Sequence, residues 1–344
     1  MSQSVQAVPS FLERRPYRAR EAMRPTVREW IRHFGLFAAT ILTTTFAGTL
    51  LVSPSAPGFH VAEPTSILGY IGYIPLVYLS EISSVISQIS SHPAILGQGL
   101  AFSASLLAIL TAHESGHYIA CRLYNVDATL PFFIPAPPLI LAGTFGAFIK
   151  IKSPIPTRRA LFDIGVAGPI AGFVVAIPVL FLGMLKSTVA VKTGIADGTA
   201  LIYFHDSLLA HFVSRIVGVD LSTSTPNPFY FASWIGLLVT SLNLMPVGQL
   251  DGGHAVYAAF GLTAHRWISR IAFVSMIALA VIGWFWHGSP SGFVYALLLA
   301  VVLRMPHPQP LDEHTGLDRN RQLIALGTLL IFVLSFLPFP ISVK

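Results

Sequence analysis

Long apolar runs dominate the sequence and predict the order of its helices. The runs at 34–52, 93–123 and 160–185 are each long enough to cross a hydrocarbon core of about 30 Å as an α-helix. Further runs follow at 229–245, 268–286, 293–302 and 323–337, and the short run at 293–302 is expected to be half of a hairpin. The pattern predicts an all-α polytopic membrane protein with about 6–7 transmembrane helices.

The segment between the first two of these runs is interrupted by glycine and proline. Its apolar stretch at 67–79 contains Gly69, Gly72 and Pro75. Such residues weaken or break a helix. We therefore expect an interfacial or re-entrant piece here, with a full membrane span as the alternative.

A second interrupted segment, residues 130–156, is too rich in proline for a helix. Four prolines lie between 131 and 138, and the apolar stretch at 143–151 has the composition of a β-strand. Apolar, non-helical backbone at a bilayer is tolerated where protein or a water-filled cavity covers it. We expect a short membrane-associated β-hairpin folded against the polar site of the neighbouring helix, with an open edge that can add an extended peptide as a strand. A plain surface loop is the alternative.

Composition supports the assignment to the membrane. The 344 residues are 53% hydrophobic and 10% charged, with a mean hydropathy of +0.69, whereas about 25% of residues are charged in a soluble domain. Cys121 is the single cysteine. It excludes an internal disulfide framework and an all-cysteine zinc site, and its expected role is packing.

The net charge of +6 has its densest positive cluster before the first apolar run. Seven arginines lie there: Arg14, Arg15, Arg18, Arg20, Arg24, Arg28 and Arg32. This placement predicts contacts with anionic lipid headgroups rather than with nucleic acid. The long arginine-rich lead also argues against a cleavable signal peptide. We expect a multi-pass protein of the cell inner (cytoplasmic) membrane with its N-terminus in the cytoplasm.

The candidate chemistry lies in the run at 93–123, at His113-Glu114-Ser115-Gly116-His117. Residues four apart share one face of an α-helix, so His113 and His117 can each offer an imidazole nitrogen to one ion. Glu114 is rotated by about 100° from His113 and can accept a proton from water beside that ion. This is the residue pattern of a zinc hydrolase. Packed, non-ligating histidines are the alternative, but three uncompensated polar groups in hydrocarbon are costly and a metal compensates them.

A third ligand is expected from residues 243–254. Pro246 and several glycines break a helix there, near membrane depth. The break delivers two candidates, Asp251 and His254. A catalytic zinc commonly has three protein ligands, and either side chain is chemically suitable.

Other polar groups are expected to have structural roles or to be exposed. Asp163 lies just inside a helix boundary near Arg158 and Arg159, and an ion pair is expected. The proline-rich loop at 307–314 is assigned no chemistry. Three more groups lie in a polar region without the spacing of metal ligands: His205, Asp206 and His211.

With these motifs the chain resembles the site-2 proteases, a family of intramembrane zinc metalloproteases. The resemblance covers roughly 95–253 and is carried by the 113–117 motif, by 143–151 with 167–172, and by 243–253. It implies one Zn²⁺ per chain, held by His113, His117 and Asp251, with Glu114 activating water. It also implies that Asn243 and the hairpin contact the substrate. The hairpin residues concerned are Gly143, Thr144, Phe145 and Gly146.

Two departures from the family pattern are visible. Many members have a second proline two residues after the position of Pro246, where this chain has Gly248. The resemblance therefore does not predict the conformation of the turn before Asp251. Many bacterial members carry a PDZ domain, and the interval 186–227 is too short for one, so no PDZ domain is expected. A plastid branch of the family also lacks it, but the chain shows no serine-rich, acid-poor transit segment.

These observations predict an intramembrane zinc metalloprotease that hydrolyses peptide bonds within or near transmembrane segments of membrane-protein substrates. Its expected partners are a transmembrane protein substrate and the lipid bilayer. The alternatives are a polytopic transporter, whose midplane polar residues and broken helices look similar, and a non-catalytic membrane scaffold. We expect a basic cytoplasmic tail (1–33), a first transmembrane helix with an extracytoplasmic or interfacial loop (34–93), a catalytic core (94–254) and C-terminal transmembrane helices (255–344).

Overall fold

The computed structural model describes residues 25–52, 66, 68–137, 142–189, 202–305 and 307–343. Its helices are α1 (Val27–Val52), α2 (Gly69–Ser91), α3 (Ala94–Leu123), α4 (Arg158–Leu185), α5 (Leu208–Val217), α6 (Pro228–Asn243), α7 (Asp251–His287), α8 (Ser291–Leu303) and α9 (Arg319–Ser335). Its strands are β1 (Phe132–Pro135), β2 (Thr144–Phe148), β3 (Thr188–Val189), β4 (Ile202–Phe204), β5 (Ser224–Thr225) and β6 (Ile341–Val343), which pair as β1–β2, β3–β5 and β4–β6. Several predicted features lie outside the described residues: positions 1–24 of the basic tail, 53–65 of the first loop, 138–141 of the hairpin and 190–201 of the interval too short for a PDZ domain.

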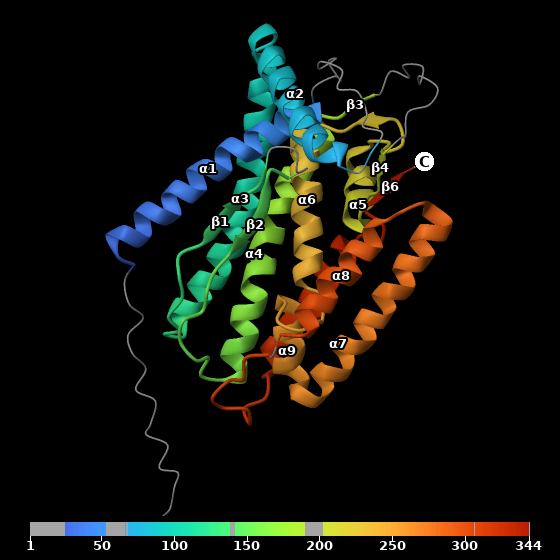
Figure 1. The fold of residues 1–344 in the computed structure, drawn as a ribbon. Coiled ribbons are helices and arrows are strands. Elements are labelled where there is room, and N and C mark those ends of the chain that lie inside the picture. Colours follow the sequence, from blue (N-terminus) through green and yellow to red (C-terminus); the bar gives the residue numbers. More distant parts are fainter. Residues whose placement is uncertain are drawn as a thin grey trace, which may run out of the picture.

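The helices of the described chain confirm a polytopic membrane protein. Five of them, α1, α2, α3, α4 and α7, are long and apolar enough to cross a membrane. Two others, α6 and α9, are slightly shorter at 16 and 17 residues. The 13-residue α8 turns back along α7 and completes a helical hairpin, as its short apolar run predicted (Figure 1).

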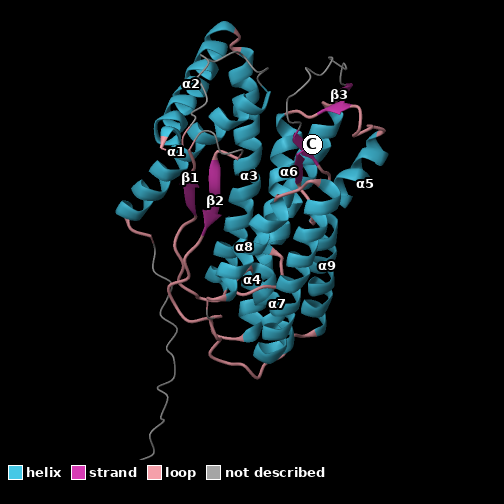
Figure 2. Cartoon of the chain, turned by 45° about the vertical axis from the view of Figure 1, so that its right-hand side comes forward, coloured by secondary structure: helices cyan, strands magenta, loops and turns pink. Residues whose placement is uncertain are grey.

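The segment expected to be interfacial or re-entrant belongs instead to one continuous helix. α2 runs from Gly69 to Ser91, and its 23 residues suffice for a span by length and composition. The interrupting residues, including Pro75, lie in its first two turns, so the helix loses only one internal hydrogen bond near its start. Figures 1 and 2 place α2 at one end of the molecule, beside the start of α3.

α4 is the central helix of the bundle and packs against α3, α6 and α7 (Figures 1 and 2). Glycines make these contacts close. A β-carbon at Gly116 of α3 would lie 2.4 Å from the carbonyl oxygen of Ala167 in α4. One at Gly183 of α4 would lie 2.7 Å from the backbone nitrogen of Tyr230 in α6. Small residues therefore set the spacing between these helices.

The predicted β-hairpin is present. β1 and β2 pair antiparallel, and a bridge between Ala128 and Ile151 extends the pairing into a ribbon of residues 128–135 and 144–151. Phe133 of the ribbon is buried and packs edge-on against Phe37 of α1, with 4.8 Å between ring centroids. The ribbon contacts both α1 and α3 and is not a plain surface loop (Figure 2).

Candidate metal centre

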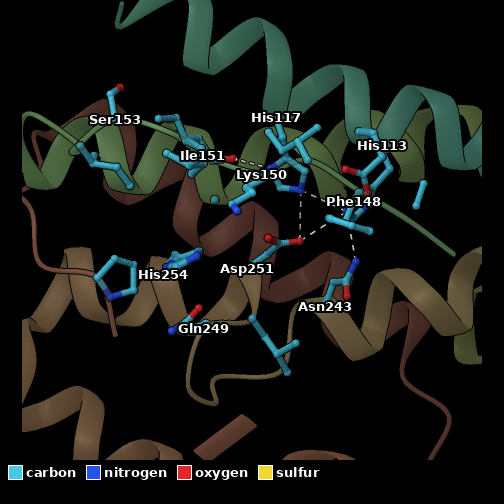
Figure 3. Close-up of a pocket in the computed structure, with 18 of the residues that line it drawn as sticks. His113, His117, Phe148, Lys150, Ile151, Ser153, Asn243, Gln249, Asp251 and His254 are labelled. Atoms are coloured by element: carbon cyan, nitrogen blue, oxygen red, sulfur yellow. Dashed lines mark hydrogen bonds and ion pairs between the residues drawn. The ribbon is translucent and has the colours of Figure 1, made fainter. Parts of the chain in front are cut away.

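Three side chains of types that can ligate a metal, from α3 and α7, meet at one point (Figure 3). The Nε2 atoms of His113 and His117 are 3.1 Å apart. They lie 3.4 Å and 3.3 Å from Oδ2 of Asp251, the first residue of α7. A tetrahedral zinc ion with bonds of about 2.0–2.1 Å separates its ligand atoms by about 3.3 Å. The three donor atoms therefore fit zinc, and the described part of the chain holds no other such group.

α4 fixes the orientation of the His117 ring. Nδ1 of His117 lies 2.7 Å from the carbonyl oxygen of Ile164, to which it donates in the tautomer that leaves Nε2 free for a metal. The ring lies directly over Gly168, and His113 lies beside Gly172 one turn later on α4. Larger residues on this face of α4 would occupy the space that both histidines use.

The turn between α6 and α7 places Asp251 against the histidines. A β-carbon at Gly252 would lie only 2.0 Å from the carbonyl oxygen of Leu244. The start of α7 can therefore pack against this turn only because Gly252 has no side chain. Gly248 has a φ of 53°. Proline fixes φ near −65°, so the turn before Asp251 differs from the family pattern that has a second proline at this position.

Glu114 lines the same pocket but does not join the three-donor group. Its side chain is buried. The backbone N–H of Ile149, on the ribbon, faces this carboxylate. Glu114 therefore lies in the pocket that also contains the three donor atoms.

A pocket of about 590 Å³ contains the metal centre. Ribbon residues 147–151 form part of its lining, and Phe148, Lys150 and Ile151 among them are labelled in Figure 3. Asn243 also lines it, with its amide Nδ2 3.1 Å from Nε2 of His113. An extended chain that lies along the ribbon would therefore pass both the metal ligands and Asn243.

The four hairpin residues expected to contact the substrate lie outside the pocket lining. Gly143 packs against α1, because a β-carbon there would lie 2.4 Å from the carbonyl oxygen of Thr43. Thr144 is buried, and its hydroxyl donates to a ribbon carbonyl. Phe145 is 63% exposed, and the space around Gly146 is open. The next residues of the ribbon reach the pocket, and the sequence indicated a strand there without marking them as site residues.

His254, the alternative third ligand, is turned away from the donor group. Its Nδ1 lies 2.9 Å from Nε2 of His307. The ring of Tyr257 stacks on His307 at 4.4 Å between centroids, and the Tyr257 hydroxyl donates to Glu313. The loop given no chemistry from sequence thus forms part of the pocket wall and holds His254. A histidine in a proline-rich loop without the spacing of metal ligands carried no signal of this contact.

Asp163 forms an ion pair, but its partner is Arg321 of α9 and not Arg158 or Arg159. Arg321 lies 2.6 Å from the Asp163 carboxylate, which also accepts a hydrogen bond from Tyr124. Arg158 instead donates to the carbonyl oxygen of residue 258 and Arg159 to that of residue 316. The two arginines near Asp163 in the sequence therefore bind other parts of the chain, and the ion pair of Asp163 with Arg321 joins α4 to α9.

The chain is similar to proteins described as probable zinc metalloproteases. The profile described as Peptidase family M50 matches residues 101–283. The protein named "Probable zinc metalloprotease EGY1, chloroplastic" of Arabidopsis thaliana is 32% identical over 243 residues, which are 70% of this chain and 43% of that protein. The proteins of the same description named EGY2 and EGY3 from Oryza sativa subsp. indica are 29% and 28% identical over 72% and 68% of this chain, and 44% and 41% of their own lengths. The chain spans less than half the length of these relatives.

Proposed function

The chain belongs to peptidase family M50, and on this basis we propose that it is an intramembrane zinc metalloprotease. It hydrolyses peptide bonds within or near the transmembrane segments of membrane-protein substrates. The observation that carries the proposal is the group of His113, His117 and Asp251 with Glu114 beside it, enclosed by helices long enough to cross a membrane. A transporter or scaffold accounts less well for this site. The polar side chains here converge on one point, whereas those of a transporter are spread along a transport pathway.

His113, His117 and Asp251 are proposed to hold one zinc ion per chain. When bound, zinc polarises a peptide carbonyl and lowers the pKa of water to about 7. Ile164 and Gly168 support this set, because the first accepts a hydrogen bond from His117 and the second gives its ring room. The ligands therefore come from α3 and α7, and α4 orients one of them.

Glu114 is proposed to be the general base and then the general acid. It takes one proton from the attacking water as the water oxygen bonds to the peptide carbon. The carbon–nitrogen bond then breaks, and Glu114 delivers the proton to the leaving nitrogen. The backbone N–H of Ile149, which faces the carboxylate, is proposed to steady it during both transfers.

The substrate is proposed to lie extended along the ribbon. A transmembrane helix hides its carbonyls in internal hydrogen bonds, so the segment must unwind before a peptide bond reaches the metal centre. Pairing with residues 147–151 would replace the lost hydrogen bonds. Asn243 is proposed to contact the substrate near the scissile bond, and Gly143–Gly146 to contact it further along the ribbon.

The protein is a multi-pass membrane protein, and we propose the cell inner membrane with a cytoplasmic N-terminus. Lys152, which precedes α4, pairs with Glu29 at the start of α1 at 3.1 Å, so the starts of these helices are linked. Arg158, Arg159 and Arg321 lie near the starts of α4 and α9. The positive-inside rule assigns such a basic end to the cytoplasm. The proposed catalytic core of 94–254 and the C-terminal helices of 255–344 meet within α7.

The test of the proposal compares wild type with Glu114→Gln. Each is reconstituted in liposomes with a single-span membrane protein whose span contains glycine and proline, and products are identified by mass spectrometry. We expect cleavage by wild type, no cleavage by Glu114→Gln, and about one zinc per chain in both. Glu81→Gln, on the exposed surface of α2, is the matched control and should cleave at the wild-type rate. Cleavage by Glu114→Gln at that rate would refute the assignment of the base.

A further inference from the structure

A second cavity of about 510 Å³ lies between the first part of α7 and α9. It shares no lining residue with the metal pocket. Its lining is apolar except for Gln322 and Thr328. The volume is that of a typical ligand site, and proteolysis at the metal centre gives this cavity no role.

The rim of the cavity consists of exposed apolar side chains. Phe260 of α7 is 67% exposed and Leu326 of α9 is 63% exposed. The part of α9 that lines the cavity extends from Gln322 to Phe332, ten residues further along the helix. At 1.5 Å per residue this is about 15 Å, which equals one leaflet of a hydrocarbon core about 30 Å thick. The cavity therefore has the length of a lipid acyl chain.

An exposed arginine lies next to one end of the cavity, between its lining residues Leu317 and Gln322 in the sequence. Arg319 is exposed and begins α9, three residues before Gln322 and seven before Leu326, so the three share one face of the helix. Arg321 is held by two carboxylates, whereas within the described ranges no carboxylate forms an ion pair with Arg319. The other end, near Phe332, is apolar. This gradient matches an amphiphile with an anionic head.

We propose that this cavity binds an acyl chain of an anionic phospholipid, with Arg319 holding the headgroup phosphate. Lipid tails are as apolar as leucine, so burial of the chain alone gives no preference among lipids. The preference comes from the arginine charge, which attracts anionic headgroups. The cavity is lined by Gly252 and Ala255, one residue on from Asp251 and His254 of the metal pocket. The bound lipid thus packs behind the turn that carries Asp251.

The test reconstitutes the full chain in phosphatidylcholine nanodiscs that contain a minor fraction of phosphatidylglycerol and counts the retained lipids by native mass spectrometry. We expect wild type to retain phosphatidylglycerol about fivefold more strongly than phosphatidylcholine. Arg319→Gln should remove this preference, and Ala259→Leu, which fills the cavity, should lower retention of both lipids. Arg266→Gln and Ala278→Leu change exposed residues outside the cavity and should match wild type.

Thermal unfolding identifies any variant that does not fold, and Leu326→Trp at the exposed rim then replaces Ala259→Leu. Equal retention of the two lipids by wild type overturns the proposal, as does an equal loss of preference in Arg266→Gln and Arg319→Gln. A photoreactive residue at position 326 that cross-links to a protein and not to lipid overturns it as well. None of these readouts requires cleavage, so their outcome is independent of the proposed protease activity.

Discussion

A β-carbon at Gly168 of α4 would lie 2.1 Å from Nε2 of His117. The imidazole therefore rests directly on the backbone of α4. One turn earlier on the same helix, the carbonyl oxygen of Ile164 lies 2.7 Å from the other ring nitrogen. α4 contributes none of the three donor atoms, yet it confines the ring of His117 and offers a carbonyl oxygen that favours the tautomer with a free Nε2.

Gly168→Ala should weaken zinc binding at least tenfold, because the added methyl group displaces the ring of His117 from the metal position. Residues that orient a metal ligand typically contribute 10–100-fold to affinity. Competition with a chelator of known affinity measures the change. Gly327→Ala in α9 is the control, since its added methyl group meets open space. Zinc affinity equal to wild type in Gly168→Ala would show that the ring is not confined as described.

Asp251→Ala should lose the zinc and His254→Ala should keep it. Asp251 contributes one of three donor atoms, and two imidazoles alone make a weak site. Nδ1 of His254 is engaged by His307. Metal analysis of the purified variants distinguishes the two. Loss of zinc in His254→Ala together with its retention in Asp251→Ala would exchange their roles.

The part of the site that lies on one helix could be predicted, because helical geometry is local. The spacing of His113 and His117 places both rings on one face of α3 wherever that helix packs. The choice between Asp251 and His254 could not be made from spacing. It depends on the turn after α6 and on His307, which is 53 residues further along the chain than its contact His254.

In the fold, too, features that depend on neighbouring residues could be predicted, whereas contacts between residues distant in the sequence could not. Prolines near residue 131 excluded a helix and correctly indicated the hairpin, because their effect on the backbone is local. Pro75 misled the prediction for α2, since a proline in the second turn shortens the hydrogen-bond ladder without ending the helix. The partner of Asp163 was also missed, because Arg321 is 158 residues away in sequence.

Ile149→Pro should impair cleavage while leaving zinc in place. Proline removes the N–H that faces the Glu114 carboxylate, and none of the three donor residues is changed. Ile149→Ala keeps that N–H and is the matched control, so it should cleave nearly as wild type does. The ratio of cleavage rates at equal zinc content is the measurement. Equal rates in the two variants would show that the backbone donor does not hold the base.

His307 should make the stability of the protein depend on pH. Burial, with smaller contributions from His254 and His265, lowers the pKa of His307 from 6.5 to about 3. The folded protein therefore keeps this imidazole neutral at a pH where the unfolded chain binds a proton. The contribution of His307 to stability is complete above pH 6.5 and declines as the pH falls from 6.5 toward 3.

His307→Gln cannot titrate, so the difference in unfolding free energy between wild type and this variant should shrink between pH 7 and pH 5. The slope is at most about 1.4 kcal/mol per pH unit, and the partial exposure of the ring reduces it. Both proteins share the same metal ligands, so the protonation of His113 and His117 cancels in the difference. Denaturant unfolding in detergent micelles at each pH measures it. A difference that stays constant from pH 7 to pH 5 would show that His307 binds its proton equally well in the folded and unfolded chains.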